Sequence, residues 1–154
     1  MADVEKVVDD FRMAMFEHHD AGAAASLYAE DATYSDPEVG TITGREAIKQ
    51  LYEGYLKAFP DMKGEVTTVL VAGNLFAAEA KLSGTHSGPL EVSPDTVIPP
   101  SGKPMEFSIA WFGRVNEEGL FTEDRTYYDP AIWRAQIGLE EQEKGELGEA
   151  AAAA

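Results

Sequence analysis

Apolar residues in the first part of the chain recur every three or four positions, which is the spacing of one buried helix face. This pattern predicts an amphipathic helix over residues 4–18 and another over residues 45–59. The second helix follows Thr43, and a capping box with Glu46 would satisfy its first backbone donors. Between the two, a short helix is predicted at residues 23–28. The N-terminal part of the chain is therefore expected to be helical.

A period of two replaces the helical period from residue 65 onward, as expected where alternate residues face the core of a sheet. A shorter strand with a turn is predicted before it, at residues 32–40. The four longer strands are predicted at residues 65–71, 75–86, 105–115 and 120–128. Helices followed by antiparallel strands predict an α+β domain with its helices on one face of a sheet.

Two further segments follow neither pattern. Residues 87–104 contain five of the eight prolines and predict a long extended loop, which in a compact domain is often a lid or an interface arm. A last short helix is expected to begin at the N-cap Asp129 and to end at Gly138. We therefore expect one domain, residues 1–139, and a disordered acidic, alanine-rich tail, residues 140–154.

The chain carries a net charge of −16, and this excess of carboxylates narrows the choice of partner. Binding to nucleic acid or to an anionic membrane requires clustered Lys and Arg, and the sequence has no such cluster. It has no cysteine, which excludes disulfides and thiolate chemistry. No apolar run reaches the roughly 18 residues of a membrane span, and the first residues lack a signal-peptide pattern. We expect a cytoplasmic protein that binds neither nucleic acid nor membranes.

Eight segments, taken in order, resemble those of the SnoaL-like polyketide cyclases, a family of the nuclear transport factor 2-like superfamily related to the ketosteroid isomerases. They are Leu27-Tyr28-Ala29-Glu30-Asp31-Ala32, Asp36-Pro37, Gly44-Arg45-Glu46-Ala47-Ile48, Ala58-Phe59-Pro60-Asp61, Gly84-Thr85-His86-Ser87-Gly88, Pro99-Pro100-Ser101-Gly102-Lys103, Tyr127-Tyr128-Asp129 and Gln136-Ile137-Gly138-Leu139. The resemblance implies a cone-shaped fold, in which a curved antiparallel sheet wraps around three N-terminal helices and encloses a central pocket. It also implies a homodimer that pairs through the outer sheet face.

The resemblance implies three candidate reactions, none of which uses a cofactor. SnoaL-like cyclases close a polyketide ring by an intramolecular aldol condensation. Ketosteroid isomerases move a proton α to a carbonyl group, and limonene-type epoxide hydrolases activate water. Each reaction needs an ionisable group in a mostly apolar pocket, because desolvation moves the pKa of a carboxyl group toward neutrality.

Asp36 is the first candidate for the base. The stretch that ends in Asp36-Pro37 resembles the ketosteroid isomerase segment that holds the catalytic aspartate, although an aspartate before a proline is also common in turns. The oxyanion partners of the isomerase are not evident, because one of their positions falls near Arg12 and Met13 and the other near Ala110 or Trp111. This departure disfavours steroid isomerisation proper.

Asp124 is the second candidate. By the resemblance, the even-numbered residues of the last strand face the pocket, and they include Asp124, Thr126 and Tyr128. The cyclases and epoxide hydrolases commonly carry an aspartate where this chain has Thr126, so Asp124 would have to replace it. Alternatively, Asp124 is an ordinary strand carboxylate that pairs with Arg114 or Arg125.

His86 is the third candidate, because it continues the apolar face of the strand at residues 75–86. It could orient a substrate carbonyl group or carry a proton. Alternatively, it is a partly buried histidine that is bonded to the backbone. Asp129 is explained by its capping role before Pro130 and is not expected to be catalytic.

Several aromatic and hydroxyl side chains suit a pocket for a flat molecule, although aromatic residues at these spacings also suit a plain core. The predicted substrate-binding residues are Tyr34, Tyr52, Tyr55, Phe59, Trp111, Thr126 and Tyr128. The three histidines lack metal-ligand spacing, and no Gly-rich phosphate loop follows a strand, so neither a metal nor a nucleotide cofactor is expected.

These observations lead to one hypothesis and two rivals. In the hypothesis, Asp36 or Asp124 removes a proton α to the carbonyl group of a small or polycyclic molecule, and His86 or a tyrosine stabilises the enolate. The first rival is a non-catalytic small-molecule-binding module, which the threonine at position 126 favours. The second is epoxide hydrolysis, for which only Asp124 and Arg125 suggest the required Asp–Arg–Asp set.

Overall fold

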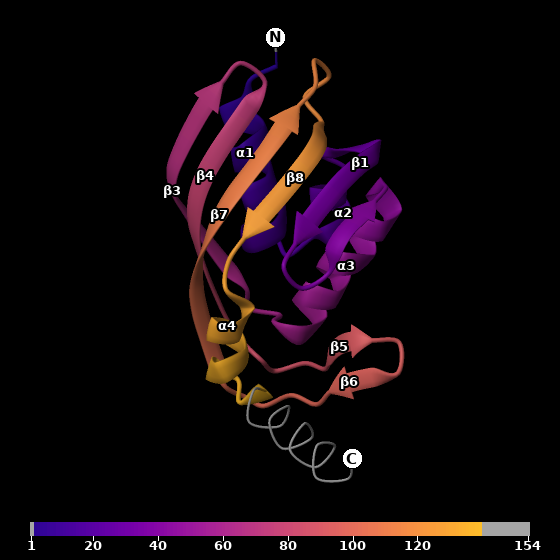
Figure 1. Cartoon of the computed structure of the whole chain (residues 1–154), viewed down its shortest axis with the longest axis vertical. Helices are drawn as coiled ribbons and strands as arrows, with labels where there is room; N and C mark the ends of the chain where they lie inside the picture. The colour runs from indigo at the N-terminus through magenta and orange to yellow at the C-terminus, as the bar shows by residue number, and fades with distance from the viewer. Residues whose placement is uncertain (1, 140–154) are drawn as a thin grey trace, which may run out of the picture.

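The helices lie against a curved sheet in the computed structural model, which describes residues 2–139. Figure 1 shows α1 behind the sheet, α3 beside β1 and α4 at the lower end. The helical segments are α1 Val4–Arg12, the π-helical turn η1 Met13–Glu17, α2 Ala21–Ala25, α3 Arg45–Ala58 and α4 Pro130–Gln136. No helix among the described residues is long and apolar enough to cross a membrane. The predicted tail, residues 140–154, lies outside the described residues.

Six strands form one sheet in the order β2-β1-β8-β7-β4-β3, and two short strands form a separate hairpin. The strands are β1 Tyr28–Asp36, β2 Gly40–Thr43, β3 Lys63–Ala72, β4 Leu75–Thr85, β5 Leu90–Ser93, β6 Thr96–Ile98, β7 Pro104–Val115 and β8 Phe121–Tyr127. Neighbouring strands of the large sheet pair antiparallel, except that β1 and β8 run parallel. No tight turn joins these two strands, so nothing forces them to run in opposite directions. The predicted α+β cone is confirmed, with this one parallel pair as a difference.

The chain leaves helix for strand earlier than the pattern predicted. α2 ends at Ala25, and Tyr28 already belongs to β1, where it pairs with Phe121 of β8. The Tyr28 side chain is fully buried, so its tertiary contacts outweigh the local helical pattern. The predicted capping box does not form either, because Thr43 ends β2 and Gly44 is the N-cap of α3 with φ 103°. Residues with a side chain rarely adopt that conformation.

The predicted loop at residues 87–104 contains the β5–β6 hairpin, which projects below α3 in Figure 1. Its stem is held against the end of α3, where Gly88 N donates to Ala58 O over 3.1 Å. A Cβ atom on Gly88 would lie 1.8 Å from the carbonyl oxygen of Lys57, so only glycine permits this close approach.

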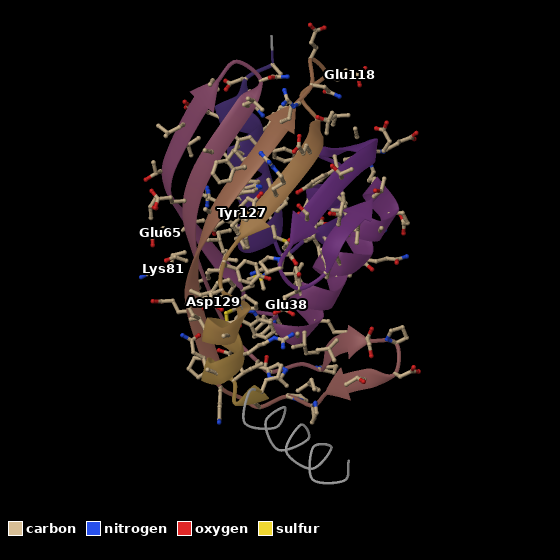
Figure 2. The ribbon with its side chains drawn as sticks, in the orientation of Figure 1. Glu38, Glu65, Lys81, Glu118, Tyr127 and Asp129 are labelled. Atoms are coloured by element: carbon tan, nitrogen blue, oxygen red, sulfur yellow. The ribbon has the colours of Figure 1, made fainter. Side chains whose placement is uncertain are left out.

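The core lies between α1 and the inner face of the sheet. The ring of Phe11 lies between 5.2 and 6.3 Å from the rings of Tyr28, Tyr52, Trp111 and Phe121. Charged side chains such as Glu65, Lys81 and Glu118 instead lie on the exposed surface, as Figure 2 shows. The aromatic cluster fixes the inner faces of β1, β7 and β8, from which polar groups also point inward.

Candidate functional site

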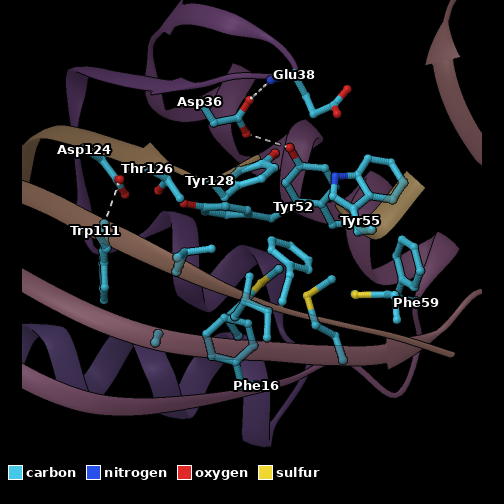
Figure 3. A pocket seen from close by; sticks show the side chains of 18 of the residues that line it. Phe16, Asp36, Glu38, Tyr52, Tyr55, Phe59, Trp111, Asp124, Thr126 and Tyr128 are labelled. Carbon is cyan, nitrogen blue, oxygen red and sulfur yellow. Dashed lines mark hydrogen bonds between the residues drawn. The ribbon is translucent and has the colours of Figure 1, made fainter. Parts of the chain in front are cut away.

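A cavity of about 110 Å³ lies between the helices and the inner face of the sheet. Most of the side chains that line it are apolar, and they come from helices and strands alike. Of the described residues that line it, only Asp36, Glu38 and Asp124 carry a charged group (Figure 3). An apolar cavity with a few inward polar groups is the usual form of a small-molecule site.

The structure brings nine of the ten predicted site residues to this cavity. The nine are Asp36, Asp124, Tyr34, Tyr52, Tyr55, Phe59, Trp111, Thr126 and Tyr128. They come from four separate parts of the chain, namely β1, the α3 region, β7 and the segment from the middle of β8 to Tyr128. His86 is not among the lining residues. The positions of the nine are therefore known, while their roles stay predictions.

Asp124 sits in the middle of β8 and is 2% exposed. Its Oδ1 accepts a hydrogen bond from Trp111 Nε1 at 2.9 Å, and its Oδ2 accepts one from the Tyr28 hydroxyl. The Tyr28 hydroxyl also shares a hydrogen bond of 2.6 Å with the Tyr52 hydroxyl. Burial raises the pKa of Asp124 to about 7, although the hydrogen bonds from Tyr28, Trp111 and Thr126 oppose that rise. This carboxyl group can therefore gain or lose a proton near neutral pH.

Asp36 ends β1 and is 7% exposed, and four donors surround it. Its Oδ2 accepts from the hydroxyls of Tyr34 at 2.8 Å and Tyr55 at 2.9 Å. Its Oδ1 accepts from the backbone N–H groups of Glu38 at 2.7 Å and Val39 at 2.9 Å. All four groups donate, so the carboxyl group accepts at both oxygens. Asp36 thus builds the β1–β2 turn and also faces the cavity.

The tyrosines around the cavity are held in their protonated form. Burial raises the pKa of Tyr34, Tyr52 and Tyr55 well above the ordinary value, and it also raises that of Tyr128. Among the described residues, the Tyr128 hydroxyl has no hydrogen-bond partner, whereas the other three hydroxyls are engaged. Tyr128 is therefore the tyrosine whose hydroxyl is available to a bound molecule.

His86 is fully buried behind the cavity wall, where its ring centroid lies 5.5 Å from that of the lining residue Phe59. Its Nδ1 accepts from the backbone N–H of Ser101 at 3.2 Å and lies 2.9 Å from the Ser101 hydroxyl. Its backbone also bonds to Lys103 and Gly102, so His86 ties together the two ends of the β5–β6 arm. Burial lowers its pKa, which keeps the imidazole neutral. Its ring bonds to the backbone, as the alternative interpretation expected.

The sequence analysis did not identify Tyr28, whose hydroxyl donates a hydrogen bond to the Asp124 carboxyl group. The pattern placed Tyr28 at the end of a helix, whereas it begins β1. The useful signal was the alternation of Ala32, Tyr34 and Asp36, whose side chains are all buried on one face of β1. Extending that strand back to Tyr28 would have placed the hydroxyl on the inner side.

Sequence reasoning also missed an ion pair at the rim of the cavity. Arg134 of α4 donates to Glu38 through Nε at 3.1 Å and through Nη2 at 2.7 Å. Glu38 and Trp133 both line the cavity, so the pair fastens α4 to the β1–β2 turn across its edge. Glu38 and Arg134 lie 96 positions apart, and no local pattern links them.

The remaining charged candidates lie away from the cavity. Arg125 and Arg114 pair with Glu123, at 3.1 and 3.8 Å, and not with Asp124. Asp129 caps α4, since its Oδ1 accepts from Ala131 N at 3.0 Å. Among residues 2–139, no group of three or more His, Asp or Glu residues is placed to hold a metal ion.

The fold and its cavity define a cone-shaped protein of the nuclear transport factor 2-like type. Within that class, the chain belongs to the SnoaL-like family, because the model of the SnoaL-like domain matches residues 8–124. No curated protein matches the chain.

Three similar solved structures illustrate the range of this fold. A protein with a ketosteroid isomerase-like fold from Catenulispora acidiphila DSM 44928, in complex with trimethylamine, is 27% identical, covers 87% of this chain and 93% of its own, and has a TM-score of 0.70. IdmH from Streptomyces antibioticus, provisionally a polyketide cyclase, is 25% identical over 89% and 99% of the two chains, with a TM-score of 0.72. SalBIII, an epoxide hydrolase/cyclase-like enzyme of pyran ring formation in the polyether salinomycin, is 14% identical over 83% and 92%, with a TM-score of 0.68. The last likeness concerns the fold alone.

Proposed function

We propose that this protein is a cofactor-free acid–base catalyst of a carbonyl compound, and that Asp124 transfers the proton. The observation that carries the proposal is a carboxyl group buried in an apolar cavity, with a pKa raised to about 7. A group whose pKa lies near the working pH can both accept a proton and return it. Membership of the SnoaL-like family and the likeness to IdmH support a reaction of the cyclase or isomerase type.

Hydrogen-bond capacity favours Asp124 over Asp36 as the base. A carboxylate offers about four lone-pair positions, and four donors already occupy those of Asp36. Three side chains interact with Asp124, which leaves one position for a proton from a ligand. Asp124 thus replaces Asp36, the first candidate from the sequence, because the donors around each carboxyl group are evident only in the structure.

The proposed step begins with the ionised form of Asp124. One oxygen of Asp124 takes the proton from a carbon α to a carbonyl group, and the C–H electrons form an enolate. The Tyr128 hydroxyl donates a hydrogen bond to the enolate oxygen, where negative charge has developed. In an isomerisation, protonated Asp124 returns the proton to another carbon. In a cyclisation, the enolate carbon attacks a second carbonyl group of the same molecule, and Asp124 protonates the new alkoxide.

Exchange of α-hydrogens in D₂O tests this step without knowledge of the natural substrate. Small open-chain ketones and enones suit the cavity of about 110 Å³, because a one-ring molecule such as benzene needs about 150 Å³. We expect the wild type to speed their α-deuteration, as measured by proton NMR, and Asp124→Asn to lose that rate. If the wild type binds these ketones and exchanges no hydrogen, the protein is a binding module and the proposal is wrong.

The lining of the cavity supports the two alternative functions, a binding module and epoxide hydrolysis, to different degrees. A binding module is supported by the apolar lining and by Thr126, which stands where the cyclases carry an aspartate. Epoxide hydrolysis is less well supported, because no arginine is among the described residues that line the cavity. Arg125, which the sequence offered for that role, pairs with Glu123 instead.

We also propose that the protein forms a homodimer through the outer face of the sheet. Leu70, Leu75, Phe112 and Tyr127 are exposed there, between 37% and 66% of each residue. They belong to β3, β4, β7 and β8, which are neighbours in the sheet (Figure 2 labels Tyr127). Light scattering should give the mass of a dimer for the wild type and of a monomer for Phe112→Glu. A monomeric wild type at micromolar concentration would overturn this proposal.

A further inference from the structure

We propose that the binding site has a second compartment, a surface groove separated from the cavity by the ring of Phe16, which takes the anionic end of a carbonyl-containing ligand. The groove lies between η1 and β3, with a volume of about 850 Å³. This inference rests on the cavity being the binding site, as the proposed function requires. It does not depend on which carboxyl group transfers the proton.

The size of the cavity is the first reason to look for a second compartment. About 110 Å³ is less than the roughly 150 Å³ that accommodates benzene, whereas sites for larger organic ligands occupy about 300 to 1,000 Å³. A ligand with more than one ring must therefore extend beyond the cavity. The Glu38–Arg134 ion pair fastens α4 over one edge of the cavity, whereas another part of the cavity wall is made only of apolar contacts.

Phe16 forms such a wall. It is half-buried, and both Phe16 and Val66 line the cavity on one side and the groove on the other. The Phe16 side chain makes no hydrogen bond or ion pair, and its aromatic neighbour is Phe11, with ring centroids 6.0 Å apart. Moving the ring therefore breaks only apolar contacts, whereas opening the α4 side breaks a charged pair.

Two backbone features hold Phe16 in this position. The first is the π-helical turn η1, in which His18 N donates to Met13 O at 2.9 Å; such turns are frequent at functional sites. Because of this turn, the consecutive residues Met15 and Phe16 both line the cavity. The second is Gly64 of β3, where a Cβ atom would lie 2.4 Å from the Phe16 ring. Only glycine at this position lets the ring lie against the strand.

The charges of the groove indicate the ligand that it would take. Three cations, Arg12, Lys63 and Lys81, face three carboxylates, Glu17, Glu65 and Glu106, so the groove is neutral within a chain of net charge −16. Arg12 pairs with Glu17 at 3.0 Å and Lys81 with Glu106 at 3.2 Å. Figure 2 shows Glu65 and Lys81 near one another on adjacent strands. An anionic group is repelled less in this neutral groove than on a surface with the average charge of the chain.

Two fluorescent probes with the same ring skeleton test the inference. N-phenyl-1-naphthylamine is neutral, and 1-anilinonaphthalene-8-sulfonate adds one sulfonate group. We expect Phe16→Leu to raise the affinity for both probes at least threefold, because a smaller side chain joins the two compartments. We expect Lys63→Glu to weaken binding of the sulfonate at least fivefold and to change binding of the neutral probe less than twofold. Near-UV circular dichroism checks that each variant is folded.

The matched control for charge is Lys57→Glu. Lys57 is an exposed lysine of α3 outside the groove, and its replacement changes the net charge by the same amount. If Lys57→Glu weakens sulfonate binding as much as Lys63→Glu does, the inference is wrong. It is also wrong if Arg134→Gln raises both affinities while folded Phe16→Leu leaves them unchanged, because ligands would then extend past α4. Both probes report binding without turnover, so the results for Phe16 and Lys63 stand whether or not Asp124 transfers a proton, and failure of the proposed chemistry remains distinguishable.

Discussion

Asp124 and Asp36 line the same cavity, yet the chain surrounds them in opposite ways. Asp124 lies in the middle of a strand, and aromatic side chains from three other elements supply its donors, namely Tyr28, Trp111 and, through Tyr28, Tyr52. Asp36 lies at the end of a strand, and two of its four donors are backbone N–H groups of the turn that it builds. The first environment favours a proton carrier, and the second favours a side chain that holds a turn in place.

The comparison teaches that cavity lining alone does not identify a base. Both carboxylates are more than nine-tenths buried, and both belong to segments that the sequence analysis singled out. Two properties separate them. The first is the number of carboxyl lone pairs that donors of the protein already occupy, and the second is the free-energy cost of a negative charge at each position. Pairs of carboxyl groups whose environments differ in this way often divide the acid and base roles between them.

The largest expected effect is on α-hydrogen exchange. Asp124→Asn should lower the rate at least 100-fold, because an amide cannot accept the proton at neutral pH and a general base contributes about 10² to 10⁴ in rate. Asp36→Asn should lower it less than tenfold, since Asp36 keeps a turn and two tyrosines in place. Rates measured by NMR for the two folded variants decide the matter, and the reverse order would make Asp36 the base.

The inward positions of the last strand could be predicted because their register is local. Alternation along residues 120–128 separated the two faces of the strand, and the family resemblance placed Asp124, Thr126 and Tyr128 on the cavity side, where they lie. The capping role of Asp129 was equally readable, because its acceptor serves an N–H two residues away. Periodicity and capping are short-range properties, and the sequence displays them directly.

The donors of each carboxylate could not be predicted, since they depend on contacts between distant segments. Tyr28 reaches Asp124 across 96 positions, through the parallel pairing of β1 with β8. His86 shows the converse case: the inward face of the strand holds for Phe76, Ala78 and Ala80. That strand ends at Thr85, however, so His86 bonds to the arm and does not line the cavity. Strand periodicity predicts which face of the sheet a residue lies on, but it does not predict how far along the cone the residue lies.

The next effect is on stability as a function of pH. The pKa of Asp124 is about 7 in the folded protein and 3.8 ordinarily, so between these values the unfolded chain ionises first. Stability due to this group is therefore greatest at low pH, falls from about pH 4 to pH 7 and is constant above. Compared with Asp124→Asn, the wild type should lose roughly 2 to 3 kcal/mol between pH 5 and pH 8. Urea unfolding at both values measures this; an equal change in the two proteins would show that the group is ionised throughout.

A smaller effect is expected from Asp36→Asn. The amide can still accept from the turn N–H groups, but its NH₂ faces two tyrosine hydroxyls that now donate to a carboxylate, and about 1 to 3 kcal/mol should be lost. The charge of Asp36 also contributes to the raised pKa of Asp124, so that pKa should fall in the variant. Carbon-13 NMR titration of the Asp124 carboxyl group gives the shift. An unchanged midpoint would mean that the two carboxylates do not interact through the cavity.

The smallest effect is expected at a third aspartate, which separates loss of charge from loss of position. Asp129 lies outside the cavity and caps α4 by accepting from Ala131 N. Asn is about as good an N-cap as Asp, so Asp129→Asn should change the free energy of unfolding by less than about 0.5 kcal/mol, whereas Asp129→Ala should cost about 1 kcal/mol. Neither should alter α-hydrogen exchange, because α4 is also held by Arg134 and by the hydrogen bonds between Gln136 and Glu106. If Asp129→Asn lowered the exchange rate as much as Asp124→Asn does, the rate would follow net charge. The proposed difference between the two cavity aspartates would then be wrong.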